Sequence, residues 1–299
     1  MNKQIKSFTV VFLVFTFFGI FFSGCATKKL PRPTPSCVVT SSDYLPSDFL
    51  WQTVAPGIER FDYQYPSIPV IYHAVKIDLN TSALELVCFP DAKTKTDSTG
   101  HFFSTKASRF AKKNRCVVAV NASPFEGLLS IKKKIVGIHL FNKTEFSAPE
   151  NRYAAIAFTE NQTKTGLTYT AHIIKNQLQD MAQNYDFAFG GFFVVLQNGQ
   201  VQESFAQIYD SRTGVGISED GKTLYILVVE GERFSKSIGL TYPECGQIFK
   251  AMGCTDALEM DGGGSTELCI NGRSILTYQT LRVQANCFGF RFTKSDMNY

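Results

Sequence analysis

The chain has 299 residues, with 30 lysines and arginines against 26 aspartates and glutamates, and its formal net charge at pH 7 is +4. This charge is too small for a nucleic-acid-binding protein, and the longest basic run, residues 132–134, is too short. Apolar residues make up 44% of the chain and include 27 phenylalanines, enough for a sizeable core in one large domain or two small ones.

The first residues have the pattern of an export signal. Lys3 and Lys6 precede an apolar stretch at residues 8–22, and two small residues then precede Cys25. This order is similar to a bacterial lipoprotein signal, whose cysteine is lipidated and becomes the first mature residue. The alternative is an uncleaved N-terminal membrane anchor.

These features predict three segments. We expect a lipoprotein signal peptide at 1–24, a lipidated N-terminus with a Pro-rich tether at 25–60, and one domain at 61–299. Removal of the signal peptide leaves a net charge of +2. Seven cysteines follow Cys25, most of them within apolar runs, which indicates buried free thiols and names no disulfide pair.

The first half of the domain contains mostly strand patterns. Residues 69–79 and 83–89 alternate like paired strands, and the turn-forming residues between them predict a hairpin. Residues 104–115 predict a surface helix, with Ser104 as N-cap and basic residues in the last turn. Strands are expected at 116–120, 134–142 and 152–160.

The second half adds clear turn signals. Residues 189–202 predict a hairpin that turns at Asn198-Gly199, and residues 212–231 a second hairpin that turns at 219–221. A helix is expected from Thr241, because Glu244 three residues later completes a capping box and Gly253 follows the end. Three further strands close the chain, at 257–260, 267–270 and 285–292, and a turn is expected at Asn271-Gly272. Many strands, few helices and no repeated βαβ alternation favour a single α+β domain with mixed or antiparallel sheets and a surface cavity.

The sequence from Ala257 to Leu268 reads ALEMDGGGSTEL, where a strand meets three consecutive glycines. A tight turn is the simplest interpretation, and close approach of a ligand to the backbone is the functional one. No lysine follows the glycines as in a P-loop, no helix follows as in a dinucleotide site, and Glu267 stands where a nucleophile elbow needs glycine. The four histidines are scattered, so zinc catalysis is unsupported. Alternation places Glu259 and Asp261 on one face.

Four blocks, in order, resemble a known family. They are NASPF from Asn121, GGFFVVLQNG from Gly190, SRTGVGISEDGKTLYILVVEG from Ser211 and MGCTDALEMDGGGSTEL from Met252, and LRVQANCFGF is similar to the segment that usually closes the domain. Together they are similar to the phosphodiester glycosidase domain of exported bacterial proteins. The chain departs from the usual pattern where it has Phe192 and Phe193 for proline, Glu259 for asparagine and Glu230 for aspartate. The charge that Glu259 adds beside Asp261 would raise the pKa of a neighbouring carboxyl.

The resemblance implies a set of site residues. Asp261 and Glu230 are the expected catalytic carboxyl groups. Arg212 is the expected phosphate-stabilising cation because its planar fork matches two phosphate oxygens, and Arg282 is the second choice. The alternatives are a surface salt bridge for Arg212 and a solvent-facing hairpin end for Glu230. The expected substrate-binding residues are Asn121, Glu259, Gly262, Gly263, Gly264, Ser265 and Arg282.

The implied function is hydrolysis of a sugar-1-phosphodiester, of the N-acetylglucosamine-phosphate type or a related surface glycan, by an exported lipoprotein in the cell envelope or periplasm. No cofactor is required, although a Ca²⁺ ion could use Asp261 and nearby carbonyls. The expected partners are the phosphate-containing glycan and, through the lipid, the membrane, with no nucleic acid. The alternative is a non-catalytic lipoprotein of the same fold that binds a surface polysaccharide.

Overall fold

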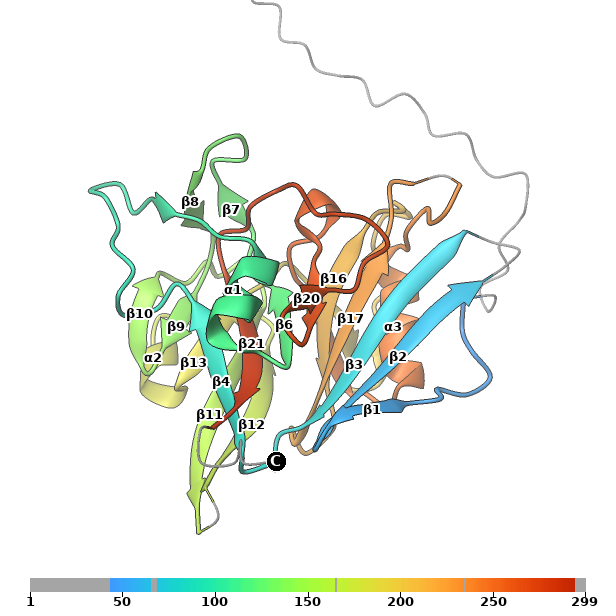
Figure 1. Ribbon diagram of the computed structural model, residues 1–299, viewed down its shortest axis with the longest axis horizontal. Coiled ribbons are helices and arrows are strands. Elements are labelled where there is room, and N and C mark those ends of the chain that lie inside the picture. Colours follow the sequence, from blue (N-terminus) through green and yellow to red (C-terminus); the bar gives the residue numbers. More distant parts are fainter. Residues whose placement is uncertain (1–43, 66–68, 165, 234, 294–299) are drawn as a thin grey trace, which may run out of the picture. The chain divides into compact units, whose positions relative to one another are not determined.

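The computed structural model describes residues 44–65, 69–164, 166–233 and 235–293. Cys25, and with it the predicted signal peptide and lipid anchor, lies outside these residues. Among the described helices, none has the length and apolar content needed to cross a membrane. This part of the chain forms antiparallel sheets with three short α-helices, which confirms the predicted α+β class (Figure 1).

The largest sheet has eight strands in the spatial order β1-β2-β3-β17-β16-β18-β14-β15. In chain order, these strands are β1 (Gln52–Ala55), β2 (Ile58–Tyr65), β3 (Val70–Asp78), β14 (Val194–Gln197), β15 (Gln200–Val201), β16 (Arg212–Ile217), β17 (Thr223–Glu230) and β18 (Asp256–Glu259).

Two five-stranded sheets and a small three-stranded sheet complete the fold. The first five-stranded sheet contains β10 (Thr144–Ser147), β9 (His139–Phe141), β13 (Phe187–Gly190), β11 (Ala155–Thr163) and β12 (Gly166–Ile174). The second contains β20 (Arg273–Ser274), β19 (Leu268–Ile270), β6 (Val118–Asn121), β21 (Cys287–Phe292) and β4 (Leu84–Phe89). The small sheet contains β5 (Phe102–Phe103), β8 (Lys132–Ile135) and β7 (Phe125–Glu126).

The helices are α1 (Ala107–Asn114), α2 (Met181–Asn184) and α3 (Tyr242–Ala251). The capping box of α3 is present as predicted, because the Thr241 and Glu244 side chains each accept from the other's backbone N–H. α1 begins later than predicted. Ser104 donates its hydroxyl to the carbonyl of Ile131 at 2.6 Å, so it does not cap the helix.

The predicted turns are mostly confirmed. β16 pairs with β17, β14 with β15, and β19 with β20. The hairpin predicted from residues 69–79 and 83–89 is wrong. β3 pairs with β2 and β17, whereas β4 pairs with β21, because the turn between β3 and β4 carries the chain from one sheet into another.

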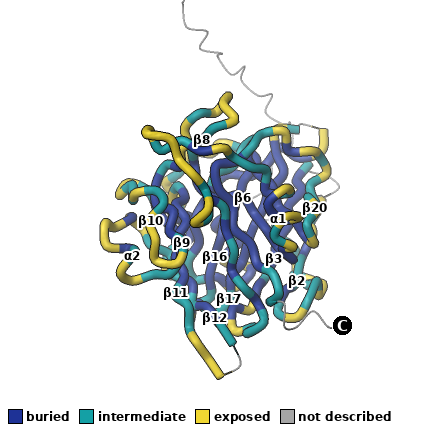
Figure 2. Tube along the Cα trace, turned by 60° about the vertical axis from the view of Figure 1, so that its left-hand side comes forward, coloured by how far each residue is buried: buried dark blue, intermediate teal, exposed yellow. Residues whose placement is uncertain are grey.

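Both faces of the eight-stranded sheet are buried (Figure 2). One face shares a core with the two five-stranded sheets, to which Val215, Phe158 and Phe288 contribute. The other face packs against α3. Glycines on β16 permit this contact, because a Cβ at Gly214 would lie 2.9 Å from the ring of Phe249.

Ordered structure starts before the expected boundary at 61. Tyr44 is 1% exposed within the core beside α3, and β1 and β2 add two strands to the main sheet. The cysteines are buried free thiols, as predicted, at Cys88, Cys116, Cys245, Cys254, Cys269 and Cys287. Cys37 lies outside the described residues.

Candidate functional site

Three neighbouring central strands of the large sheet have an end at the same side of the molecule, which we call the sheet edge. Most of the predicted site residues lie there. β16 begins at Arg212, and its neighbours β17 and β18 end at Glu230 and Glu259. Because β16 pairs antiparallel with both neighbours, these three ends lie together. Asp261 and the glycine turn follow directly after β18.

The glycine turn packs against the protein's own backbone. A Cβ at Gly262 would lie 2.6 Å from the Ser211 carbonyl oxygen, and one at Gly264 would lie 2.9 Å from the Arg282 guanidinium. Gly263 has a left-handed φ of 58° and donates its N–H to the same Ser211 carbonyl at 2.8 Å. The predicted close approach therefore comes from Ser211 and Arg282, and contact between a ligand and this turn stays a prediction.

Asp261 combines a raised pKa with two nearby cations. Burial raises the pKa of this carboxyl to about 7, and a hydrogen bond with Ser265 and the charges of Arg282 and Lys133 only partly offset that effect. Arg282 donates to the Ser265 hydroxyl at 3.2 Å. The Asp261 residue keeps partial solvent access. Near pH 7 it can therefore exchange a proton readily, beside groups that attract an anion.

Asn121 joins two sheets at this turn. Its Nδ2 donates to the carbonyl of Asp261 at 2.6 Å, and its Oδ1 accepts from the Thr213 hydroxyl at 3.0 Å and the Glu267 N–H at 2.9 Å. The residue is 1% exposed. Both polar atoms of the side chain are thus used in the fold, and the predicted contact with a sugar hydroxyl is untested.

Glu230 is the buried end of a row of three charged groups that reaches the surface at Asp62. Its Oε1 lies 3.1 Å from His73 Nε2, and His73 Nδ1 lies 2.6 Å from Asp62 Oδ1. Thr277 donates its N–H to Glu230 Oε1 at 2.7 Å and its hydroxyl to Oε2. Glu230 is 0% exposed, so the alternative of a solvent-facing hairpin end is wrong.

The hydrogen bonds among Asp62, His73, Glu230 and Thr277 stabilise the charged forms of the three titratable groups. Burial raises the pKa of Glu230, but the hydrogen bonds from His73 and Thr277 outweigh burial and leave that pKa below its ordinary value. Burial lowers the pKa of His73, but the contacts with Asp62 and Glu230 outweigh burial and raise it. An imidazolium between two carboxylates is therefore the favoured form near neutral pH.

One loop binds Glu230 and also reaches the glycine turn beside Asp261. We call residues 275–286 the strap; it lies between β20 and β21 and arches over the sheet edge in dark red (Figure 1). Its Thr277 binds Glu230, its Tyr278 forms a side-chain hydrogen bond with Ser211, and its Arg282 binds Ser265. The strap thus couples the Glu230 end of the site to the Asp261 end.

Arg212 faces away from this arrangement. Its Nε donates to the Leu240 carbonyl at 2.9 Å, its Nη2 donates to the Ile208 carbonyl, and its guanidinium lies 4.3 Å from the ring centroid of Tyr242. The residue is buried, so the alternative of a surface salt bridge is wrong. These contacts give Arg212 a structural task, and its catalytic role stays a prediction.

Glu259 lies beside Arg212 on the α3 side of the sheet. Both of its oxygens are buried and accept no hydrogen bond from a nitrogen or oxygen atom of the described residues, and the Cys245 thiol lies next to them. Burial raises the pKa of Glu259 to about 7, and Arg212 and Cys245 only partly offset that effect. The expectation that Glu259 acts on the pKa of Asp261 is not met, because different groups surround each carboxyl.

Sequence reasoning missed His73, Asp62, Thr277 and Lys133. The polar histidine within the apolar strand 69–79 was the available signal. Lys133 is the one buried lysine of the run 132–134, and its ammonium donates to the carbonyls of residues 127 and 128 at 2.7 and 2.9 Å. Within the described residues, no three His, Cys, Asp or Glu side chains gather as a metal site would require.

The family match covers the site. Residues 114–291 match the model of the phosphodiester glycosidase family. The chain belongs to this family. The match includes the glycine turn, Glu230 and the strap, while Asp62 and His73 precede it.

One relative of this chain is distant in sequence. The SPbeta prophage-derived uncharacterized protein YomE of Bacillus subtilis is 24% identical over 230 residues, which are 71% of this chain and 34% of the relative. The matched region thus spans about a third of that relative's length.

Solved structures show the same fold. The zebrafish N-acetylglucosamine-1-phosphodiester alpha-N-acetylglucosaminidase catalytic domain, auto-inhibited by its pro-peptide, has a TM-score of 0.56 at 16% identity, covering 81% of this chain and 86% of that one. A hypothetical protein from Synechocystis has a TM-score of 0.60 at 14% identity, covering 83% and 64%. A candidate exported protein from Burkholderia pseudomallei has a TM-score of 0.53 at 11% identity, covering 74% of each chain.

Proposed function

We propose that this phosphodiester glycosidase hydrolyses a sugar-1-phosphodiester, of the N-acetylglucosamine-phosphate type or a related surface glycan. The observation that carries the proposal is Asp261, a partly accessible carboxyl whose pKa burial raises to about 7 and which has Arg282 and Lys133 nearby. The zebrafish relative bears the name of an enzyme with this substrate class.

The reaction breaks the bond between the anomeric carbon and the phosphate oxygen. The phosphate leaves as a monoester, and the hydroxyl of a water molecule ends on the anomeric carbon. A phosphate monoester has a second pKa of about 6, so it leaves with little protonation, in contrast to an alcohol. Cations near the leaving group therefore matter more than a strong general acid.

The ionised form of Asp261 supplies the reactive carboxylate. It either accepts a proton from the attacking water or attacks the anomeric carbon itself, and both routes need the negative charge. Arg282 is the cation that we place against the phosphate. Its guanidinium lies at the glycine turn and donates to Ser265, whereas two nitrogens of Arg212 already donate to backbone carbonyls.

Glu230 acts in this proposal as a positioning residue. Its oxygens accept the N–H and hydroxyl of Thr277, so the ionised carboxylate holds the strap, and the strap carries Arg282. His73 keeps Glu230 ionised through their hydrogen bond.

We further propose that the protein is exported and tethered to a membrane through a lipid on Cys25. The basic and apolar N-terminal sequence supports this proposal. A Ca²⁺ ion at Asp261 is not part of the proposed mechanism.

The test is to incubate the purified protein with a methyl diester of N-acetylglucosamine 1-phosphate and to measure the released sugar. We expect turnover that Asp261→Asn abolishes and that Glu219→Gln, at an exposed acid in the β16–β17 turn, leaves unchanged. Tight binding of phosphoglycans with no release of sugar from any of them would instead support the polysaccharide-binding alternative.

A further inference from the structure

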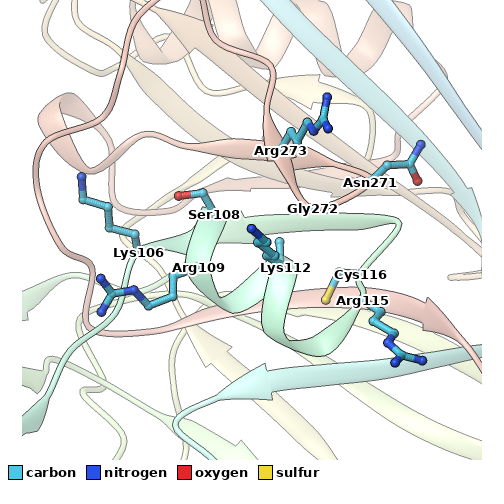
Figure 3. A pocket seen from close by; sticks show the side chains of 10 residues that line it. Lys106, Ser108, Arg109, Lys112, Arg115, Cys116, Asn271, Gly272 and Arg273 are labelled. Carbon is cyan, nitrogen blue, oxygen red and sulfur yellow. The ribbon is translucent and has the colours of Figure 1, made fainter.

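A basic pocket lies outside the site described above. It occupies about 870 Å³ between α1 and the β19–β20 hairpin (Figure 3). Five cationic side chains line it, and they are Lys106, Arg109, Lys112, Arg115 and Arg273. No acidic residue is among its lining residues.

The positive charge of this pocket is not neutralised by the protein. Within the described residues, none of the five cations forms a salt bridge. Arg109, Lys112, Arg115 and Arg273 are exposed. Glu85, an acid near Arg115, is bound to Arg291 by two hydrogen bonds of 2.8 and 2.9 Å. Glu267, whose carboxylate accepts the N–H of the lining residue Ser108 at 3.4 Å, is buried and forms no salt bridge with these cations among the described residues. The pocket thus holds five cations without a salt-bridge partner in the described part of the chain.

The pocket adjoins the strap, which also carries Arg282 of the proposed catalytic site. Lys106 donates its ammonium to the Thr280 carbonyl of the strap at 2.8 Å. The N–H of Ala107, the first residue of α1, is bound by Gln284 of the strap at 3.0 Å, and Gln284 also donates to the Ser265 carbonyl at 3.1 Å. Arg282 lies between these two strap residues in sequence. The strap thus links the wall of the pocket to Arg282 within one part of the fold.

We propose that this pocket binds a second phosphate group of the substrate, so that the substrate is a polymer in which sugar-phosphate links repeat. This inference rests on the proposed function for the bond that is cleaved. Each repeat of such a polymer carries one negative charge, which the unpaired cations attract. Arginine forks are suited to phosphate oxygens, and two of the exposed arginines, Arg109 and Arg273, come from the two elements that form the pocket walls.

The lining favours a glycan over a nucleic acid. Single-stranded nucleic acids gain much of their affinity from bases that stack on aromatic side chains. No aromatic residue is among those that line this pocket. The pocket can hold phosphates but offers no platform for a base.

The test compares two double variants of the full chain that lose the same charge. Arg109→Gln with Arg273→Gln empties the pocket of one cation from each wall, and Lys175→Gln with Lys250→Gln removes two exposed lysines elsewhere. Arg115 is left intact because it ends α1 with a left-handed φ of 57°. The binding probe is fluorescent inorganic polyphosphate, which contains no glycosidic bond. The kinetic probes are a polymer of N-acetylglucosamine 1-phosphate and its monomeric methyl diester.

We expect the pocket variant to bind polyphosphate about tenfold more weakly, with a salt dependence of log Kd that is smaller by roughly 1.5, since each neutralised phosphate contributes about 0.7–0.9 in nucleic acids. Its KM for the polymer should rise by a similar factor, while kcat/KM for the monomer stays within about twofold of wild type. The lysine variant should match wild type.

Three results would overturn the inference. They are equal weakening by both double variants, polyphosphate binding unchanged by the pocket variant, and oligothymidylate binding as tight as that of polyphosphate. Normal cleavage of the monomer beside any of these results would leave the proposed function standing. Conversely, pocket-dependent polyphosphate binding without release of sugar from either substrate would refute the proposed function and the substrate role of the pocket.

Discussion

Replacing Asp261 by asparagine distinguishes a catalytic role of this carboxyl from a structural role. Asparagine keeps the shape of the side chain and removes the charge. Because both proposed routes use the ionised carboxylate, we expect the variant to lose turnover by about a hundredfold or more. In the wild type, kcat/KM for the monomeric diester should rise with pH through about 7, where Asp261 ionises.

The same substitution should raise stability at high pH. A carboxyl pKa that folding raises from 3.8 to about 7 corresponds to at most about 4 kcal/mol of destabilisation by the ionised form, and partial solvent access reduces this to roughly 2 kcal/mol. The penalty is absent well below pH 3.8, where the carboxyl is neutral in both states. It grows as pH rises and is complete above the folded pKa of about 7.

The assay is thermal unfolding of both proteins at pH 5 and pH 9, together with turnover at pH 8. At pH 9 the asparagine variant should melt higher than wild type by roughly 4–8 °C, and at pH 5 the two should differ by much less. Glu219→Gln, the exposed control, should show no pH-dependent difference. An asparagine variant that melts many degrees lower at both pH values and keeps most of its turnover would refute the catalytic assignment and make DGGGS a structural turn.

The other groups at the edge give separate tests. Arg282→Lys should reduce phosphodiester turnover at least about tenfold with little change in melting temperature, because lysine keeps the charge and loses the planar fork. Arg212→Lys should instead lower the melting temperature, because hydrogen bonds to two backbone carbonyls are lost. The reverse pattern would indicate that Arg212 binds the phosphate. His73→Gln should destabilise the protein by about 3 kcal/mol near pH 6. The loss should be smaller above the raised pKa of His73, because the wild type then loses the stabilising imidazolium as well. Urea unfolding below and above that pKa measures the difference, and a cost that does not change with pH would exclude a charged His73 between Asp62 and Glu230. Cys25→Ser should leave the domain folded and release it from the membrane, as tested by fractionation, because the lipid would be lost; membrane retention at the unprocessed mass would indicate an uncleaved anchor. Activity should survive EDTA, and a loss that Ca²⁺ restores would place the ion in the mechanism.

Local sequence signals predicted much of this fold. The capping box of Thr241 and the turns at Asn198-Gly199 and 271–272 depend on neighbours in the chain, and all three form as predicted. Pairing between distant segments was not predictable in the same way. Alternation in residues 69–79 and 83–89 indicated two strands correctly. It could not show that the two strands would belong to different sheets.

In the candidate site, too, local signals were informative and contacts between distant residues were not predictable. Motifs predicted Asp261 and Glu230 as site residues, but the partners of each carboxyl come from far along the chain. His73 is 157 residues before Glu230 in sequence, and Thr277 is 47 residues after it. Arg212 was a reasonable phosphate ligand by residue type, yet its direction from β16 depends on which face of the sheet α3 covers. Sequence alone does not supply that direction.

The edge of the large sheet holds two carboxyl groups whose environments move their pKa values in opposite directions. Burial dominates at Asp261 and raises its pKa to about 7, whereas hydrogen bonds from His73 and Thr277 dominate at Glu230 and lower its pKa. Such separation assigns different tasks to similar groups. Asp261 can change protonation near neutral pH, and Glu230 stays charged and holds the strap. Because the strap also carries Arg282, loss of the Glu230 charge would disturb the Asp261 end of the site without any change in Asp261 itself.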